Sequence, residues 1–117
     1  MREIIFYRTD SGKCPVEEFL DSLNAKEAQK VTWVLRLVEE LPRIPSQYFK
    51  KLANTDEIWE IRVILGGNII RILGFWDGPN LVVLTHGFHK KTQKTPLQAI
   101  KLAEARKRDY LQRRCKR

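Results

Sequence analysis

The sequence predicts a single α+β domain in which helices pack on a small antiparallel sheet. Two observations carry this prediction. Three apolar, strand-like segments separated by turn residues follow one another in the second half of the chain, and helical patterns lie before and after them. A length of 117 residues with 43% apolar residues suits one small core, so residues 1–117 are expected to fold as one unit.

The first half of the chain is predicted to form one strand and two helices. Residues 3–8, EIIFYR, are apolar and aromatic, and Pro15 suits the first turn of a helix over VEEFLDSL. Asn24, with Glu27 three positions later, has the pattern of a capping box that begins a second helix. One face of this helix should pack inward, because its apolar residues recur at helical spacing: Val31, Val34, Leu35, Val38 and Leu41.

Trp33 and Leu37 widen this apolar stripe, and we expect them in the core rather than at a ligand site. Pro42 and Pro45 end the helix. The segment that follows, PRIPSQYFKKLANTDE, is predicted to be a long exposed loop.

The second half contains three predicted strands, at residues 58–65, 69–76 and 81–88. Gly66-Gly67 and the Asp-Gly-Pro-Asn segment at 77–80 separate them, and both have the composition of tight hairpin turns. The strands therefore form an antiparallel meander. A last helix should follow, capped by Thr95 with Pro96 at its first position, which completes the order β-α-α-β-β-β-α.

These turns fix an expected register. A two-residue Gly-Gly loop places Arg62 opposite Arg71, and a four-residue loop at 77–80 places Arg71 opposite His86. Side chains that alternate with these residues should face the helices: Trp59, Ile61, Val63, Ile70 and Ile72. The other face then carries a row of Arg62, Arg71 and His86, with Glu60 close by.

Like charges directly opposite on a sheet cost roughly 0.2–1 kcal/mol per pair, so this row requires an anion or a carboxylate. In one interpretation Glu60 neutralises one arginine and the face is simply hydrated. In the other the row binds phosphate, which guanidinium groups contact through two hydrogen bonds. The segment HGFHKKTQKTP, residues 86–96, follows the row and places Lys90 and Lys91 at its rim, so that a basic cleft is predicted.

The charge distribution supports a polyanionic partner. Residues 1–85 hold 11 Lys and Arg against 12 Asp and Glu, whereas residues 86–117 hold 11 against 2. No segment has the pattern of a signal peptide or a membrane span, and Cys14 and Cys115 lack metal-site spacing. The sequence therefore predicts a cytoplasmic protein with reduced thiols.

The same residues limit the chemistry. The acidic residues show no spacing that would hold magnesium, and neither a Gly-rich phosphate loop nor a zinc pattern is present, so no metal or cofactor is expected. RNA cleavage remains compatible with this composition, because the ribose 2′-hydroxyl attacks its own phosphate. Such an enzyme needs proton transfer and stabilisation of the developing negative charge, which His, Lys and Arg supply.

Three segments resemble one family: WEIRV (59–63), IIRILGFWDG (69–78) and HGFHKKTQKTP. They are similar to the RelE/HigB-type toxins of bacterial type II toxin–antitoxin systems, within the RelE/ParE superfamily, and most of all to its phage-derived HigB-like branch. The resemblance extends over nearly the whole chain. It implies a compact toxin that enters the ribosomal A site and cleaves translated mRNA. It also implies a cognate helix-turn-helix (HigA-like) antitoxin that neutralises the toxin.

Basic residues on the central strands and before the last helix carry the activity in related toxins. The matching positions here are Arg62, Arg71, Lys90 and Lys91, with His86 in the HGF motif. Arg62 and Arg71 are expected to clamp the scissile phosphate, and either His86 or the two lysines to transfer protons. His86 is alternatively a structural histidine at a strand end.

Further cations are predicted to contact RNA, namely Lys50, Lys51 and Lys94, with His89 as a neighbour or a base-stacking residue. The basic residues of the last helix fit a solvated face as well as a binding surface: Arg106, Lys107, Arg108, Arg113 and Arg114. Tyr110 is given no role. Two alternatives stay open, a non-enzymatic ParE-like inhibitor of DNA gyrase with the same fold and a plain nucleic-acid-binding module.

Overall fold

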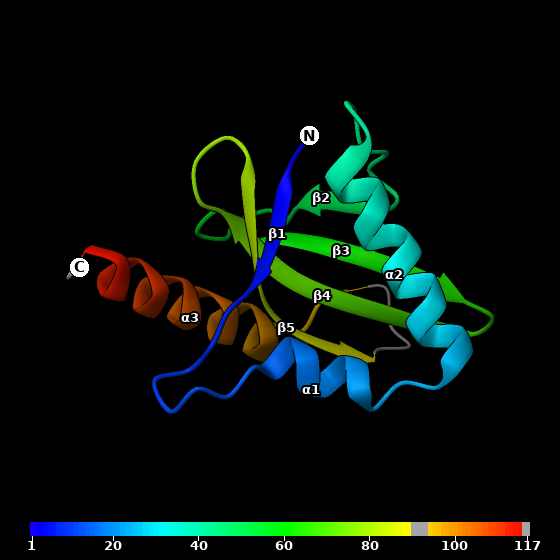
Figure 1. Cartoon of the computed structure of the whole chain (residues 1–117), viewed down its shortest axis with the longest axis horizontal. Helices are drawn as coiled ribbons and strands as arrows, with labels where there is room; N and C mark the ends of the chain where they lie inside the picture. The colour runs from blue at the N-terminus through cyan, green and yellow to red at the C-terminus, as the bar shows by residue number, and fades with distance from the viewer. Residues whose placement is uncertain (90–93, 116–117) are drawn as a thin grey trace.

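The structure is a computed structural model that describes residues 1–89 and 94–115, with Cys115 described by its backbone alone. Its elements follow one another as shown in Figure 1: β1 (Glu3–Phe6), α1 (Pro15–Asp21), α2 (Ala25–Glu40), β2 (Phe49–Lys51), β3 (Trp59–Leu65), β4 (Asn68–Trp76), β5 (Leu81–His89) and α3 (Leu97–Cys115). In the described part of the chain, no helix combines the length and the apolar character needed to cross a membrane.

The α+β class is confirmed, but the sheet is mixed rather than antiparallel. Its five strands lie in the order β1-β5-β4-β3-β2, and β1 runs parallel to β5 while the other neighbours are antiparallel. Turn residues predict only the pairing of strands joined by short loops, whereas two helices and three strands separate β1 from β5 in the sequence. The prediction also missed β2, because its three residues lie within the segment expected to be a loop and are too few to show an alternating pattern.

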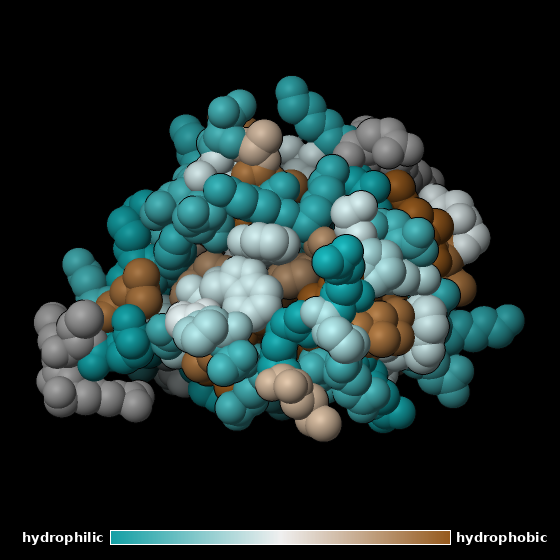
Figure 2. Space-filling view, turned by 90° about the horizontal axis from the view of Figure 1, so that it is seen from above, coloured by the Kyte–Doolittle hydropathy of each residue, from teal (hydrophilic) through white to brown (hydrophobic). Residues whose placement is uncertain are grey.

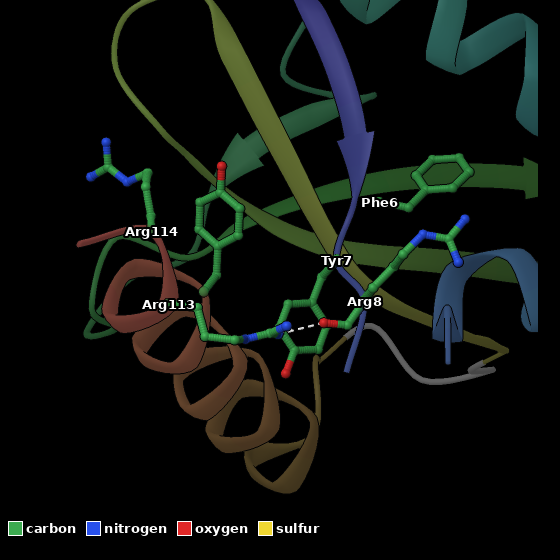
Figure 3. Close-up of a pocket in the computed structure, with 6 residues that line it drawn as sticks. Phe6, Tyr7, Arg8, Arg113 and Arg114 are labelled. Carbon is green, nitrogen blue, oxygen red and sulfur yellow. Dashed lines mark hydrogen bonds between the residues drawn. The ribbon is translucent and has the colours of Figure 1, made fainter. Parts of the chain in front are cut away.

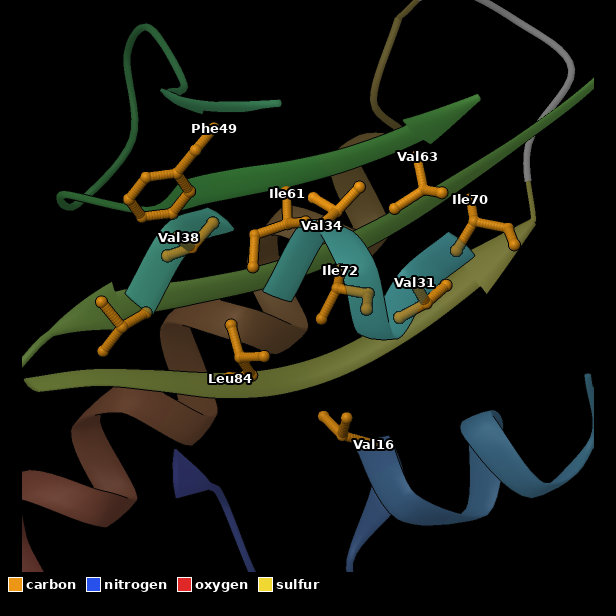
Figure 4. Close-up of a cluster of buried hydrophobic side chains, with 11 residues drawn as sticks. Val16, Val31, Val34, Val38, Phe49, Ile61, Val63, Ile70, Ile72 and Leu84 are labelled. Atoms are coloured by element: carbon orange, nitrogen blue, oxygen red, sulfur yellow. The ribbon is translucent and has the colours of Figure 1, made fainter. Parts of the chain in front are cut away.

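The two faces of the sheet are both covered. On one face Val16 of α1 and Val34 of α2 pack against Ile61 and Ile72 of the central strands, as expected (Figure 4). On the other face α3 packs through Ala103 and its apolar neighbours. This second face was predicted to be a basic cleft or a hydrated surface, and both predictions are wrong for the part beneath α3.

Helix α2 begins at the predicted capping box, in which Asn24 and Glu27 each bond the other's backbone N–H. Val31, Val34 and Val38 are buried as predicted, and Leu35 and Leu41 are half-buried. Trp33 is 45% exposed and lies outside the core. It stands two positions after Val31, which turns its side chain by about 200° on a helix and away from the apolar face.

The hairpin of β3 and β4 has the predicted register. Leu65 lies opposite Asn68, and Arg62 lies opposite Arg71. Gly66 in the turn has a φ of +61°, in the left-handed region that glycine adopts without steric cost.

The predicted pairing of β4 with β5 is wrong. Trp76 lies opposite Val82 rather than Leu81, and a bulge between Leu73 and Gly74 adds a second residue of shift. At Gly74 the strands approach so closely that a Cβ atom would lie 2.5 Å from the carbonyl oxygen of Val83. The sequence signal for this bulge is one glycine within a strand.

The shift changes the predicted row. Arg71 lies opposite Phe88, and His86 lies opposite Leu73. A shift of one residue would move His86 to the other face of the sheet, but the total shift is two residues. His86 therefore stays on the same face as Arg71. The row of Arg62 and Arg71 therefore continues into Phe88 instead of His86.

Candidate functional site

The polar centre of the α3 face is a buried ion pair between Glu60 of β3 and Arg71 of β4. Their side chains are 1% and 0% exposed, and Arg71 Nη1 lies 2.8 Å from Glu60 Oε1. Thr95, in the segment before α3, donates its hydroxyl hydrogen to Glu60 Oε2, and its Oγ1 lies 3.4 Å from Arg71 Nη1. The three residues and Arg62 are called the Glu60 cluster below. Through it, the end of the HGFHKKTQKTP segment is fixed on the sheet.

Thr95 does not serve as the predicted helix cap. Its hydroxyl is committed to Glu60, and α3 begins at Leu97, with the Pro96 carbonyl accepting a hydrogen bond from Ile100 N–H at 3.2 Å. The sequence signal was ambiguous, because a Thr-Pro pair before a helix looks the same whether the hydroxyl faces the helix or a neighbouring strand.

Arg62 is the member of the Glu60 cluster that reaches the surface. Its side chain is 23% exposed, and its Nη2 lies 3.5 Å from the same Glu60 oxygen that binds Arg71. It also lines a hollow of about 350 Å³ with Lys30 and Tyr48. The Glu60 carboxylate therefore offsets the repulsion between the two arginines, and one positive charge of the cluster remains in excess.

The predicted clamp of two open arginines must be corrected accordingly. The side chain of Arg71 is fully buried and contacts Glu60 and Thr95. It therefore has no solvent-exposed surface for a ligand. The interpretation in which Glu60 neutralises one arginine is confirmed for Arg71. Arg62 alone keeps the surface exposure that a phosphate contact requires.

Lys50 and Lys51 of β2 lie on different faces of the sheet. Lys50 is exposed and lies directly opposite Glu60 in the β2–β3 register, so it is on the same face of the sheet as the Glu60 cluster. Lys51 lies opposite Trp59 in the register and is on the other face of the sheet. Its ammonium nitrogen lies 2.7 Å from Glu57 Oε2 and forms an ion pair with it. Lys50 therefore extends the positive surface beside Arg62, whereas the charge of Lys51 is already balanced.

His86 is a buried histidine beneath α3. It is 9% exposed, its Nδ1 lies 3.1 Å from Thr85 Oγ1, and its ring stacks on Phe88 at 5.8 Å. Burial, and then the charge of Arg106, lower the pKa of His86 to about 4. The ring is therefore neutral near pH 7, which favours the structural alternative over proton transfer.

His89 lies apart from the Glu60 cluster, on the face of α1 and α2. It is opposite Ile70, its Nε2 lies 3.2 Å from a carboxylate oxygen of Glu27, and its ring contacts the edge of Phe19 at 5.4 Å. The backbone N–H of Asn24, and then His89, lower the pKa of Glu27. His89 thus connects β5 to the beginning of α2.

The remaining predicted residues come from the segment before α3. Lys94 is exposed and precedes the anchored Thr95. Lys90 and Lys91 lie outside the described residues.

The cations of α3 largely bind the body of the protein. Arg106 donates to the Thr85 carbonyl at 3.2 Å, Lys107 to the Asp56 carbonyl at 2.7 Å, and Arg114 lies 3.2 Å from Asp77. Arg108 is exposed. The basic helix is therefore held to β5 and to the segments beside β3 and β4 by most of the charges that were predicted to form a solvated or binding face.

A hollow of about 250 Å³ lies where the C-terminal part of α3 meets the chain after β1. Figure 3 shows Arg113 bonded to the backbone carbonyl of Arg8, and Arg113 also lies 2.6 Å from Asp109. Tyr7 donates to the same carboxylate at 2.5 Å, and this bond, followed by Arg113, lowers the pKa of Asp109. These contacts fasten α3 to the residues that follow β1, and Asp109 balances the charge of Arg113.

Polar side chains cover most of the face seen in Figure 2, where apolar residues form only small patches. Within residues 1–89 and 94–115, no three His, Cys, Asp or Glu side chains gather as metal ligands would. Thr95 and Glu60 are the site residues that sequence reasoning underestimated. The available signal was the proximity of Glu60 to two opposed arginines.

Comparison with known proteins identifies one family. The model of the family described as Phage derived protein Gp49-like (DUF891) matches residues 18–108, which include α2, all of β2 to β5 and the Glu60 cluster. No curated protein matches the chain significantly. The chain therefore belongs to the phage-derived Gp49-like family, a toxin-like family of the RelE/ParE type.

Proposed function

We propose that this chain is the toxin of a bacterial type II toxin–antitoxin system and that it cleaves mRNA in the A site of translating ribosomes. It acts in the cytoplasm without a metal or cofactor, and a helix-turn-helix (HigA-like) antitoxin neutralises it. Membership of a toxin-like family supports this proposal. The observation that carries it is the Glu60 cluster, because one carboxylate contacts the surface cation Arg62 and anchors Thr95 at the end of the lysine-rich segment.

The proposed reaction needs no group outside the chain and the RNA. The ribose 2′-oxygen attacks the adjacent phosphorus, the bond from phosphorus to the 5′-oxygen breaks, and a cyclic phosphate remains. One proton leaves the 2′-hydroxyl and one proton reaches the departing 5′-oxygen. Arg62 binds the phosphate oxygens and stabilises the charge that develops on them, since guanidinium groups contact phosphate through two hydrogen bonds.

Proton transfer is assigned to Lys90 or Lys91 rather than to His86. Burial beneath α3 keeps His86 away from solvent, which argues against contact with RNA. A pKa of about 4 keeps its ring neutral near pH 7. Lys50 and Lys94 are exposed and are assigned to the RNA backbone. Arg71 becomes a positioning residue that holds Glu60 and Thr95 in place.

Induced expression followed by mapping of mRNA 5′ ends tests this function. New 5′ ends within translated codons are expected for the wild-type chain and are expected to disappear in Arg62→Ala. Intact mRNA together with arrested DNA replication would instead support a ParE-like gyrase inhibitor. Intact mRNA with normal replication and growth would leave a plain nucleic-acid-binding module.

A further inference from the structure

The outer face of α2 carries an exposed tryptophan surrounded by cations. Trp33 is 45% exposed. Lys26 and Lys30 lie seven and three residues before it on the helix, and Arg36 lies three residues after it, so all three share its stripe of the surface. These four residues and Leu65 of the β3–β4 hairpin are called the Trp33 surface. None of them belongs to the Glu60 cluster.

Two shallow hollows adjoin the Trp33 ring. One, of about 410 Å³, is lined by Lys26, Lys30 and Leu65 together with Trp33. The other, of about 310 Å³, also borders Trp33 and is lined by Arg36 and Thr32 among others. The two hollows therefore offer space beside the indole for an apolar side chain of a partner.

The cations of the Trp33 surface differ from Arg113 and Arg114 of α3 in their partners. Arg113 and Arg114 of α3 each form an ion pair with an aspartate. Within the part of the chain that the structure describes, Lys26, Lys30 and Arg36 have no carboxylate within ion-pair distance. The ammonium of Lys30 lies instead 4.6 Å from the centre of the Trp33 ring.

We propose that the Trp33 surface is a docking site for an acidic segment of a protein partner. An apolar side chain of that segment occupies the hollows beside Trp33, and its carboxylates pair with Lys26, Lys30 and Arg36. Exposed tryptophan is enriched where proteins bind one another, and complementary charge around it provides specificity. The proposal does not depend on RNA cleavage, because it involves no residue assigned to that reaction.

A protein segment fits this surface better than a nucleic acid does. A base needs an open ring face for stacking, and Lys30 covers one face of Trp33 while Tyr48 meets the ring at 86°. Leu65 adds an aliphatic wall to the hollow, and Ile64 beside it is 55% exposed. Aliphatic side chains of a partner fill such a hollow, whereas a polar base edge would lose hydration there.

Selection from a peptide-display library on the purified full chain tests the proposal. We expect the enriched peptides to combine several Asp or Glu residues with a large apolar residue. Fluorescence anisotropy of one labelled peptide should show that Trp33→Ala and Lys30→Glu each weaken binding at least tenfold. Arg108→Glu is the matched control, because it changes the net charge equally at an exposed site on α3 and should change affinity less than twofold.

Far-UV circular dichroism of each variant separates a lost contact from a lost fold, and Trp33 and Lys30 lie outside the buried core. Failure to enrich any peptide, enrichment of peptides without acids, or equal weakening by Arg108→Glu would overturn the proposal. Titration with a short single-stranded RNA provides the opposing test. If Trp33→Ala weakens RNA binding and leaves peptide binding unchanged, the surface binds nucleic acid instead.

Discussion

Glu60 and Arg71 form an ion pair in the interior of the α3 face, with 2.8 Å between carboxylate and guanidinium and no more than 1% of either side chain exposed. Such a pair contributes little net stability when intact, since desolvation offsets the attraction between the charges. Removing one partner, however, leaves an uncompensated buried charge. The Glu60 cluster is therefore sensitive to single substitutions, and this sensitivity leads to the first two predictions.

Glu60→Gln should lower the free energy of unfolding by about 3–5 kcal/mol, because it leaves the Arg71 charge buried without its carboxylate. Urea denaturation measures the change. Glu57→Gln is the matched control, since Glu57 pairs with Lys51 at the surface and such pairs contribute about 0–1 kcal/mol. Equal effects of the two substitutions would contradict the buried pair.

Thr95→Val should reduce mRNA cleavage without unfolding the chain. Valine keeps the shape of the side chain but removes the hydroxyl that binds Glu60, which leaves one buried carboxylate oxygen without this donor at a cost of about 1–3 kcal/mol. Cleavage rates and urea denaturation are measured together. Thr32→Val is the control. It removes an exposed hydroxyl that donates to the backbone carbonyl oxygen of Ala28, and it should change neither quantity appreciably.

His86 should titrate near pH 4, which nuclear magnetic resonance of its ring protons measures directly. The unfolded chain takes up this proton near pH 6.5, so it binds more protons than the folded chain between the two values. The free energy of unfolding should therefore fall by up to about 3 kcal/mol through His86 as the pH decreases from 6.5 to 4. The loss should shrink in His86→Phe and persist in His89→Gln. A titration midpoint of the His86 ring near pH 6.5 would show that the ring is accessible to water.

Gly74→Ala should destabilise the chain by about 1–3 kcal/mol, the usual cost of forcing extra volume into packed structure. Its Cβ atom would lie 2.5 Å from the Val83 carbonyl oxygen, at the bulge that sets the β4–β5 register. Gly67→Ala serves as the control, because its added Cβ would lie more than 4 Å from every described atom beyond Gly67 and its two chain neighbours. Thermal denaturation of both variants measures the change. A lower melting temperature in Gly74→Ala alone would reflect the close approach of β4 and β5, whereas equal losses would reflect a general effect of alanine.

Local patterns were sufficient to predict much of this fold. The capping box at Asn24 and the Gly66-Gly67 turn are properties of a few neighbouring residues, and both the start of α2 and the pairing of Arg62 with Arg71 are confirmed. The β4–β5 register and the parallel pairing of β1 were not predictable in this way. They depend on a bulge at Gly74 and on contacts between segments distant in sequence.

The candidate site was predicted in composition more accurately than in arrangement. Glu60 and Arg71 were recognised as neighbours, but the contact of Thr95 with both side chains has no signature in the strands themselves. Trp33 shows the opposite error. Its hydrophobic character placed it in the core, while its angular position on α2 turns it toward solvent.

The most direct test of the proposed activity is a cleavage assay with purified chain, labelled mRNA and ribosomes halted on a defined codon. The wild-type chain should cut the mRNA at the A-site codon only when ribosomes are present. Arg62→Ala should slow the cut by roughly 10²–10³-fold, as expected for the loss of a group that stabilises transition-state charge, whereas Arg108→Ala should retain the wild-type rate. Uncut mRNA on A-site-programmed ribosomes, or equal rates for Arg62→Ala and the wild-type chain, would contradict the assignment of this surface to RNA cleavage.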